Sequence, residues 1–180
     1  MAVNNVKIIK NGGPNFEFQA EDRTTSSITV AMQLGEPVKV GGTGTNFVLP
    51  LLTGDCEIGT DEFVGIVAEE STETSTVDGT VLVTQLIPGL TMLRAQATTV
   101  ANINTVAKLL ALRGDWISFD VTGAGTNGPT GVFTLDEDEA TDPNVHCCKI
   151  MDGDITKGSL DVIVHANATQ AAPLTGQTMD

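Results

Sequence analysis

Short segments in which apolar residues alternate with polar or small ones run through most of this chain and end at glycine, proline or aspartate. Residues 28–32 (ITVAM) show the alternation, and the turn sequences Gly35-Glu36-Pro37 and Asp78-Gly79 separate one segment from the next. Strands separated by such turns about every ten residues are typical of a β-sandwich or a β-barrel. We therefore expect strands over 28–32, 38–40, 47–49, 63–67, 81–87, 90–93, 116–121, 130–135, 145–151 and 159–164.

The composition favours the same fold class and limits the partners. The 180 residues include 25 threonines and 19 glycines, which suit pleated strands and turns respectively. Nine Lys and Arg stand against 23 Asp and Glu, which gives a formal net charge of −14. This charge argues against nucleic-acid or anionic-membrane partners, because contacts with phosphate need cationic side chains.

One segment departs from the alternation. Residues 101–113 (ANINTVAKLLALR) place isoleucine, valine and leucine at helical spacing. Asn102 or Asn104 can cap the start of a helix here, Arg113 suits its C-terminal end, and Gly114 can adopt the left-handed conformation that terminates it. We expect a single helix, packed over the end of a β-barrel or between two halves of the molecule.

An internal repeat is visible as three pairs of similar segments that share one offset of 79 residues. The pairs are 35–40 with 114–119, 79–83 with 158–162, and 43–44 with 122–123. In the first two pairs, a glycine-led turn opens into a β-like segment in each copy. The shared register indicates a duplicated β-unit.

The two ends of the chain lack a sustained hydrophobic period. We expect an extended N-terminal arm over 1–27, a first β-unit over 28–100, the helix and a second β-unit over 101–166, and a C-terminal arm over 167–180. The expected fold is thus mainly β, with small barrel or sandwich units, one short helix and two extended arms. We expect residues 1–24 and 167–180 to make most of their contacts with other chains, as segments that order on a neighbour do.

The cysteines and the N-terminus point to synthesis in a cytosol. No apolar run of signal-peptide length follows Lys7 and Lys10. Cys56, Cys147 and Cys148 are an odd number of cysteines without extracellular context. We expect all three to be reduced thiols.

Residues with metal-binding or catalytic chemistry do not form a recognisable motif. A zinc site at His146-Cys147-Cys148 would have only Cys56 and His165 left to complete it, so we favour buried thiols. Residues 152–156 (DGDIT) match the start of a calcium loop, but lysine follows at position 6 and isoleucine at position 12. We favour a solvated turn there, and we expect no catalytic residue, no cofactor, no metal site and no enzymatic activity.

The order of turns and strands resembles that of the decoration, or cement, proteins of tailed-bacteriophage heads. The motifs are a Gly-x-Pro-Val turn, a Val-Gly-Ile-Val strand, a Gly-x-Val-x-Val strand and two Gly-Asp-led segments in the second half. In this chain they are residues 35–38, 64–67, 79–83, 114–120 and 153–162. The resemblance rests on turn-and-strand patterns and spans about residues 28–164.

This resemblance implies a structural virion protein, made in the host cytoplasm, that binds the major capsid protein on the outer surface of an assembled capsid. Its role would be to stabilise contacts between capsomers. We expect a homotrimer, because capsid lattices contain three-fold points at which a trimer repeats its contact. The alternative is a phage receptor-binding or fibre domain that binds host glycans, which the shortage of aromatic residues does not favour.

Acidic loops are the candidate contact residues. Glu69, Glu70 and residues 136–139 (DEDE) can form rim contacts with a basic capsid patch, or they can belong to a solvated surface that keeps the protein soluble. The sequence leaves open which of these roles applies, and whether the acidic loops bind calcium.

Overall fold

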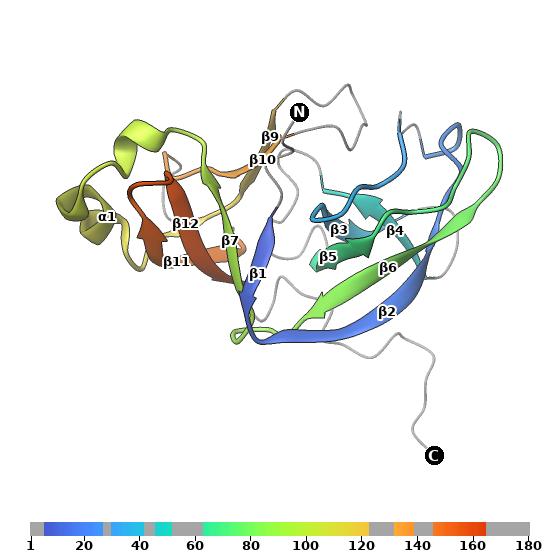
Figure 1. The fold of residues 1–180 in the computed structure, drawn as a ribbon, viewed down its shortest axis with the longest axis horizontal. Helices are drawn as coiled ribbons and strands as arrows, with labels where there is room; N and C mark the ends of the chain where they lie inside the picture. The colour runs from blue at the N-terminus through green and yellow to red at the C-terminus, as the bar shows by residue number, and fades with distance from the viewer. Residues whose placement is uncertain are drawn as a thin grey trace, which may run out of the picture.

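The computed structural model describes residues 6–26, 30–41, 46–51, 63–122, 132–138 and 146–164, and the structural statements below concern these ranges. Strands dominate, and they gather into two lobes that lie side by side (Figure 1). The elements are β1 (Lys7–Lys10), β2 (Gly12–Ala20), β3 (Pro37–Val40), β4 (Phe47–Pro50), β5 (Phe63–Glu69), β6 (Gly79–Leu86), β7 (Met92–Ala97), the 3-10 turn η1 (Val100–Asn102), α1 (Val106–Leu112), β8 (Trp116–Ile117), β9 (Phe119–Thr122), β10 (Val132–Leu135), β11 (Cys148–Asp154) and β12 (Ser159–Val164).

The first unit, β2 to β6, is a closed barrel with the strand order β2-β4-β3-β5-β6. Strands β2 and β4 pair in parallel, and the other neighbours are antiparallel. Apolar side chains, most of them from the strands, fill its interior. They are Ala20, Met32, Val38, Val48, Val64, Val67, Val81 and Val83, with Phe18 packed against them.

The second unit, β7 to β12, has the strand order β8-β11-β12-β7-β10-β9. Only Ser118 separates β8 from β9, so the two ends of this path meet in the chain. Strands β7 and β10 pair in parallel, and the other neighbours are antiparallel. If β8 and β9 are taken as one bent strand, the connectivity of the second unit repeats that of the first, with β7 in the place of β2 and β12 in the place of β6.

The strand registers repeat as well. In the hairpin β5–β6 the ladder shifts between Val67 and Glu69, and in the hairpin β11–β12 it shifts between Ile150 and Asp152. The matched pairs are Gly65–Gln85, Ile66–Thr84 and Val67–Val83 in the first unit, and Cys148–Val164, Lys149–Ile163 and Ile150–Val162 in the second. A bulge that recurs at the same point of two ladders is a designed feature of both.

The glycine turn that leads into the repeated strand is also the same in both units. Gly35 has φ 86° and Gly114 has φ 93°, a conformation that glycine adopts without a steric penalty. The Gly35 amide donates to the Val67 carbonyl at 2.9 Å, and the Gly114 amide donates to the Ile150 carbonyl at 2.9 Å. The predicted duplication, in which Val38 and Ile117 lie on equivalent strands, is therefore confirmed.

A two-stranded ribbon connects the units. Strand β1 pairs with β7 and β2 pairs with β6, so the run from β1 to β2 lies antiparallel to the run from β6 to β7. The ribbon bends at Asn11, which has φ 52°. The buried Thr91 hydroxyl donates to the Asn11 carbonyl at 2.6 Å and accepts from the Ile87 amide at 2.7 Å. These bonds fix the corner between the two lobes.

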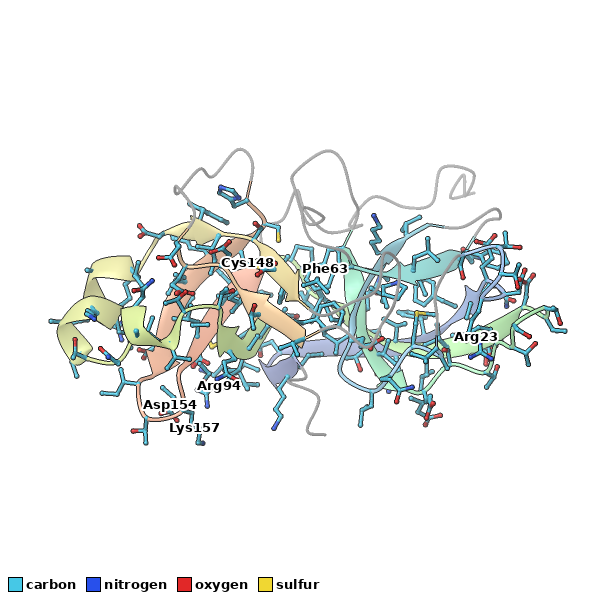
Figure 2. The ribbon with its side chains drawn as sticks, turned by 90° about the horizontal axis from the view of Figure 1, so that it is seen from above. Arg23, Phe63, Arg94, Cys148, Asp154 and Lys157 are labelled. Carbon is cyan, nitrogen blue, oxygen red and sulfur yellow. The ribbon has the colours of Figure 1, made fainter. Side chains whose placement is uncertain are left out.

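An apolar core continues across the boundary between the units. Phe63 of β5 and Phe119 of β9 are both buried, and their rings meet edge to face with centroids 5.8 Å apart. Phe63 lies near the middle of the molecule, between the two lobes (Figure 2). Aromatic pairs in this geometry add stability beyond the area they bury.

The structure corrects the predicted arm and unit boundary. Residues 7–20 are extended, as expected for the N-terminal arm of residues 1–27, but they are strands of both sheets rather than a segment apart from them. The boundary falls at residues 87–91 rather than at 100/101, because β7 pairs with β10 and β12 of the second unit. The C-terminal arm of residues 167–180 lies outside the described residues.

Two predicted elements also differ locally. Residues 30–32 of the expected strand 28–32 are not in a strand, although Met32 is fully buried. The helix predicted over 101–113 begins at Val106, because the Thr105 side chain caps it by accepting from the Lys108 amide. It ends before Gly114 as predicted, and it buries Leu109 against β11 at the outer end of the second unit.

Candidate functional site

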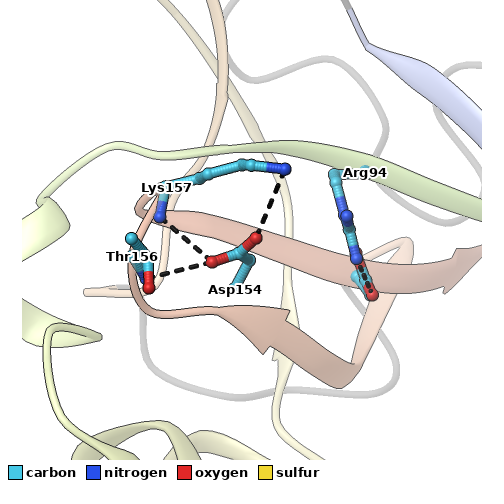
Figure 3. Close-up of polar contacts among 5 residues, drawn as sticks. Arg94, Asp154, Thr156 and Lys157 are labelled. Carbon is cyan, nitrogen blue, oxygen red and sulfur yellow. Dashed lines mark hydrogen bonds and ion pairs between the residues drawn. The ribbon is translucent and has the colours of Figure 1, made fainter.

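The calcium-like segment at residues 152–156 is a turn whose carboxylates are engaged within the chain. The Asp154 Oδ1 atom accepts from the Thr156 amide at 3.0 Å and from the Lys157 amide at 3.1 Å, as Figure 3 shows. Lys157 Nζ lies 3.6 Å from Asp154 Oδ2, and Arg113 binds Asp152 at 2.6 Å. The backbone amide of Lys157 and then that of Thr156 hold the pKa of Asp154 below its usual range. The carboxylates of this turn are thus hydrogen-bonded and ion-paired to groups of the same chain.

The cysteine segment is buried. Cys147 and Cys148 are both inaccessible to solvent, and their sulfur atoms lie 3.5 Å apart. Cys148 is a free thiol, and burial raises its pKa, so it is a poor nucleophile. Cys147 is disulfide-bonded, so the prediction of three reduced thiols is wrong at this residue. Cys56 and His165, which the predicted alternative of a zinc site would need, lie outside the described residues.

The acidic loops differ from one another in exposure. Glu69 and Glu70 are exposed at the end of β5, and Glu70 accepts from Gln33 Nε2 at 2.9 Å. Glu137 is 5% exposed, and its Oε1 atom accepts from the Thr99 amide at 3.0 Å. Glu137 therefore ties the end of β10 to the turn before η1 and is not available as a rim contact.

The neighbours of Glu137 complete this acidic loop. Burial raises the pKa of Glu137. Asp138 is exposed, and both it and Glu137 accept from the side-chain amide of Asn102. Asp136 is half-buried, and Glu139 lies outside the described residues. Glu69, Glu70 and Asp138 thus remain as exposed acidic contact candidates.

Glu36 and Glu73 are buried carboxyl groups at the first unit that were not apparent from the sequence. Glu36 is fully buried, and its Oε2 atom accepts from the Gln33 amide at 3.0 Å. Glu73 is 4% exposed, and neither of its carboxylate oxygens has a hydrogen-bond partner among the described residues. Burial first, and then the charges of Glu73 and Glu70, raise the pKa of Glu36 to about 8. Glu36 is thus predominantly protonated at neutral pH.

No local sequence pattern predicts the burial of Glu36 and Glu73. Residues 69–76 read as a polar loop, yet Ser71 and Glu73 within it are buried. The Ser71 hydroxyl accepts from the Met32 amide at 2.7 Å, which holds the loop against the barrel. One sequence feature points to Glu36: it lies between Gly35 and Pro37 in the segment that the second unit repeats.

An apolar hollow lies where β1 meets the first unit. Its volume is about 360 Å³, and it opens to solvent beside Leu34, which is 57% exposed. Hydrophobic side chains form most of the wall, and Lys7 and Thr84 add polar atoms. The remaining lining residues are Val6, Ile8, Gly35, Ile66, Val67 and Ala68.

Three features are relevant to metal, membrane and sugar binding by the described residues: a metal-binding cluster, a membrane-spanning helix and an exposed aromatic side chain. No group of three or more His, Cys, Asp or Glu residues among the described residues is placed to hold a metal ion. No helix in the described ranges is long and apolar enough to cross a membrane. Trp116 is half-buried, with Lys149 Nζ 5.5 Å from its ring centroid, so it is not a free aromatic platform for a sugar.

Comparison with known proteins finds no family model and no curated protein that matches this chain. The features that remain for a function are therefore those of the fold itself. They are two register-equivalent β-units, a fixed corner between them, a shared core and exposed acidic loops.

Proposed function

We propose that this chain is a structural virion protein that binds the outer surface of an assembled tailed-phage capsid and stabilises the contacts between its capsomers. Its partner is the major capsid protein, and it acts without catalysis. The observation that carries the proposal is the duplication. Each chain holds two copies of one β-unit, matched in connectivity, bulge position and glycine turn.

A duplicated unit suits a repeating partner. Equivalent surfaces on the two units can contact equivalent sites on neighbouring capsid subunits, so each chain bridges two of them. Linking two binding modules raises the overall affinity by about 10²- to 10⁴-fold when the geometry allows both to engage.

The connection between the units supports bridging rather than independent binding. The corner bonds of Thr91 and the Phe63–Phe119 contact fix the units relative to each other. A fixed spacing retains avidity only for a lattice that presents its sites at that spacing. This selectivity predicts a preference for one capsid state, and we expect the expanded capsid to be that state.

The proposal also covers the charge of the partner surface and the oligomeric state of this protein. A net charge of −14 favours a basic partner surface and repels packaged DNA. We propose a homotrimer at the three-fold points of the lattice, where each capsid contact repeats. A ligand that binds the assembled shell and not its parts shifts the equilibrium toward assembly.

Cosedimentation with capsids tests this proposal. The purified chain is mixed with expanded and unexpanded capsids of the phage that encodes it, and both are pelleted at several salt concentrations. We expect saturable binding to expanded capsids that weakens as salt rises, because exposed acidic contacts are screened. Failure to pellet with either capsid, together with binding to host-surface glycans, would support the fibre or receptor-binding alternative.

A further inference from the structure

Strand β2 differs from its counterpart β7 in the number of its neighbours. Strand β7 pairs with β12 along one edge, and its other edge is shared by β10 and β1. Strand β2 pairs with β6 along one edge, but β4 covers its other edge only at Gln19 and Ala20. Among the described residues, no strand pairs with that second edge at residues 15–18. The place that β1 fills in the second unit is open in the first.

The open place changes the burial of one core-facing residue. Leu93 of β7 lies opposite Ile8 of β1 and opposite Val162 of β12, and it is 0% exposed. Its counterpart Phe16 lies opposite the buried Val83 of β6, and it is 47% exposed. Both residues face the interior of their unit. Within the described ranges, no strand covers Phe16 on the open side, in keeping with its exposure.

The backbone on this side is ready to pair. The Gln19 amide donates to the Asn46 carbonyl at 2.9 Å, so the peptide groups of Gln19 point away from β6. Peptide groups alternate in direction along a strand. Those of Glu17 and Asn15 therefore point toward the open edge, where an added strand can bond them.

The charge of the residue at the centre of the open edge indicates what kind of strand can bind there. In the second unit Lys7 of β1 lies opposite Arg94, whose charge Asp161 neutralises with bonds of 2.5 and 2.7 Å. Figure 3 shows Arg94 beside the turn of Asp154, Thr156 and Lys157. The residue at the equivalent place in β2 is Glu17, which is exposed. A basic residue opposite Glu17 gains an attraction that Lys7 does not have opposite Arg94.

A second copy of this chain does not supply the strand. Its own β1 is already paired with β7, and Val6 and Ile8 pack into the core of the second unit. Removing β1 from that site would expose Val6, which is 2% exposed, and Leu93. Strand β1 of a second copy is therefore not the occupant.

We propose that the open edge of β2 binds an extended segment of a partner protein, with an apolar residue opposite Phe16 and a basic residue opposite Glu17. The segment adds antiparallel to β2, as β1 adds to β7. The identity of the partner as the capsid protein rests on the proposed function, whereas the binding mode rests on the repeat itself.

A peptide with the sequence of residues 3–11 (VNNVKIIKN) serves as the probe, because it contains the strand that fills the equivalent site. It is titrated to millimolar concentration into the full-length isotope-labelled protein, and backbone amide shifts are recorded. We expect saturable shifts centred on Asn15, Phe16 and Glu17, and none with a scrambled peptide of the same composition. No shift at these amides, or shifts centred on β7, would overturn the proposal.

Two variants sharpen the test. Glu17→Pro removes the amide that points to the open edge without removing a β6 ladder bond, and we expect it to weaken peptide binding at least tenfold. Glu17→Gln keeps the amide and removes only the charge, so we expect a smaller loss. Equal binding by Glu17→Pro, with its melting temperature near that of the wild type, would contradict strand addition. If Glu17→Pro fails to fold, the wild-type titration still decides.

The outcome is separable from the proposed function. A wild-type chain that pellets with capsids but does not bind the peptide leaves the capsid role standing and removes strand addition at β2. If the protein binds the peptide but does not bind capsids, strand addition at β2 is supported and the capsid protein is ruled out as the partner.

Discussion

Phe16 and Leu93 occupy one register position of the repeated unit in two different surroundings. Leu93 is enclosed by strands on both sides, and Phe16 is open on one side. The stability that each side chain contributes should differ accordingly, because the contribution scales with the apolar area removed from water.

Alanine substitution at both positions measures this difference. Leu93→Ala leaves a cavity in a closed core and should lower the free energy of unfolding by about 2–5 kcal/mol. Phe16→Ala removes a half-exposed side chain and should cost about 1 kcal/mol. Urea titration of the two variants gives both values. Equal losses would mean that the Phe16 side is closed in solution.

The Glu36 carboxyl predicts how stability depends on pH. Its pKa in the folded protein is about 8, above the ordinary value of 4.5, so the folded state holds a proton that the unfolded state releases. Stability should therefore fall as pH rises from about 4.5 to about 8, by up to about 1.4 kcal/mol per pH unit. After burial, the negative charges of Glu73 and Glu70 contribute to the raised pKa of Glu36.

The Glu36→Gln variant isolates this contribution. Glutamine carries no titrating proton, so the melting temperature of the variant should exceed that of the wild type at pH 8 and approach it at pH 5. Thermal melts at several pH values between 4.5 and 9 provide the measurement. A wild-type melting curve that does not change across this range would show that Glu36 is not buried as described.

At the scale of elements, the corner of the ribbon is held by one side chain. The Thr91 hydroxyl both donates to Asn11 and accepts from Ile87, and the residue is fully buried. Thr91→Val keeps the shape and removes both bonds, so the Ile87 amide and the Asn11 carbonyl lose this part-buried partner. We expect a loss of about 1–3 kcal/mol in unfolding free energy by urea titration. A change below about 0.5 kcal/mol would show that the corner does not depend on this hydroxyl.

Truncation distinguishes strands from arms. Deleting residues 1–24 removes β1 and β2, which opens the first unit and uncovers Leu93, so we expect the isolated chain not to fold. Deleting residues 167–180 is predicted to weaken capsid binding and to leave the melting temperature nearly unchanged. Circular dichroism melts of the two truncated chains measure both effects. A folded chain that lacks residues 1–24 would contradict the assignment of β2 to the barrel.

Sequence pattern predicted most elements because half-buried strands carry a period of two. Strands β6 and β7 follow the alternation, and Gly35 and Gly114 mark the repeated turn. Residues 12–20 fall within the predicted arm of residues 1–27 because the Gly-Gly-Pro run interrupts the alternation. Most side chains of β2 are exposed, so its pairing is not visible as a hydrophobic pattern.

The remaining features depend on contacts between distant residues. Burial of Glu36 and Glu73 arises from a loop folding back over the barrel, which no local pattern records. The open edge of β2 is a difference between the two folded units, which no local pattern records. The sequence predicts acidic contact candidates, of which Glu69, Glu70 and Asp138 are exposed, but it predicts no catalytic, cofactor or metal-binding residue.

On the largest scale, the chain consists of two equivalent β-units held at one spacing. The shared core around Phe63 and Phe119 and the ribbon corner join them into one body. We propose that this body bridges neighbouring capsid subunits and that each bridge resists their separation.

The most direct measurement is the temperature at which capsids release their DNA, recorded by dye fluorescence with and without the bound protein. The account predicts that saturating protein raises this temperature and that the rise disappears when the protein is washed off at high salt. An unchanged release temperature on capsids shown to carry the protein would contradict the account.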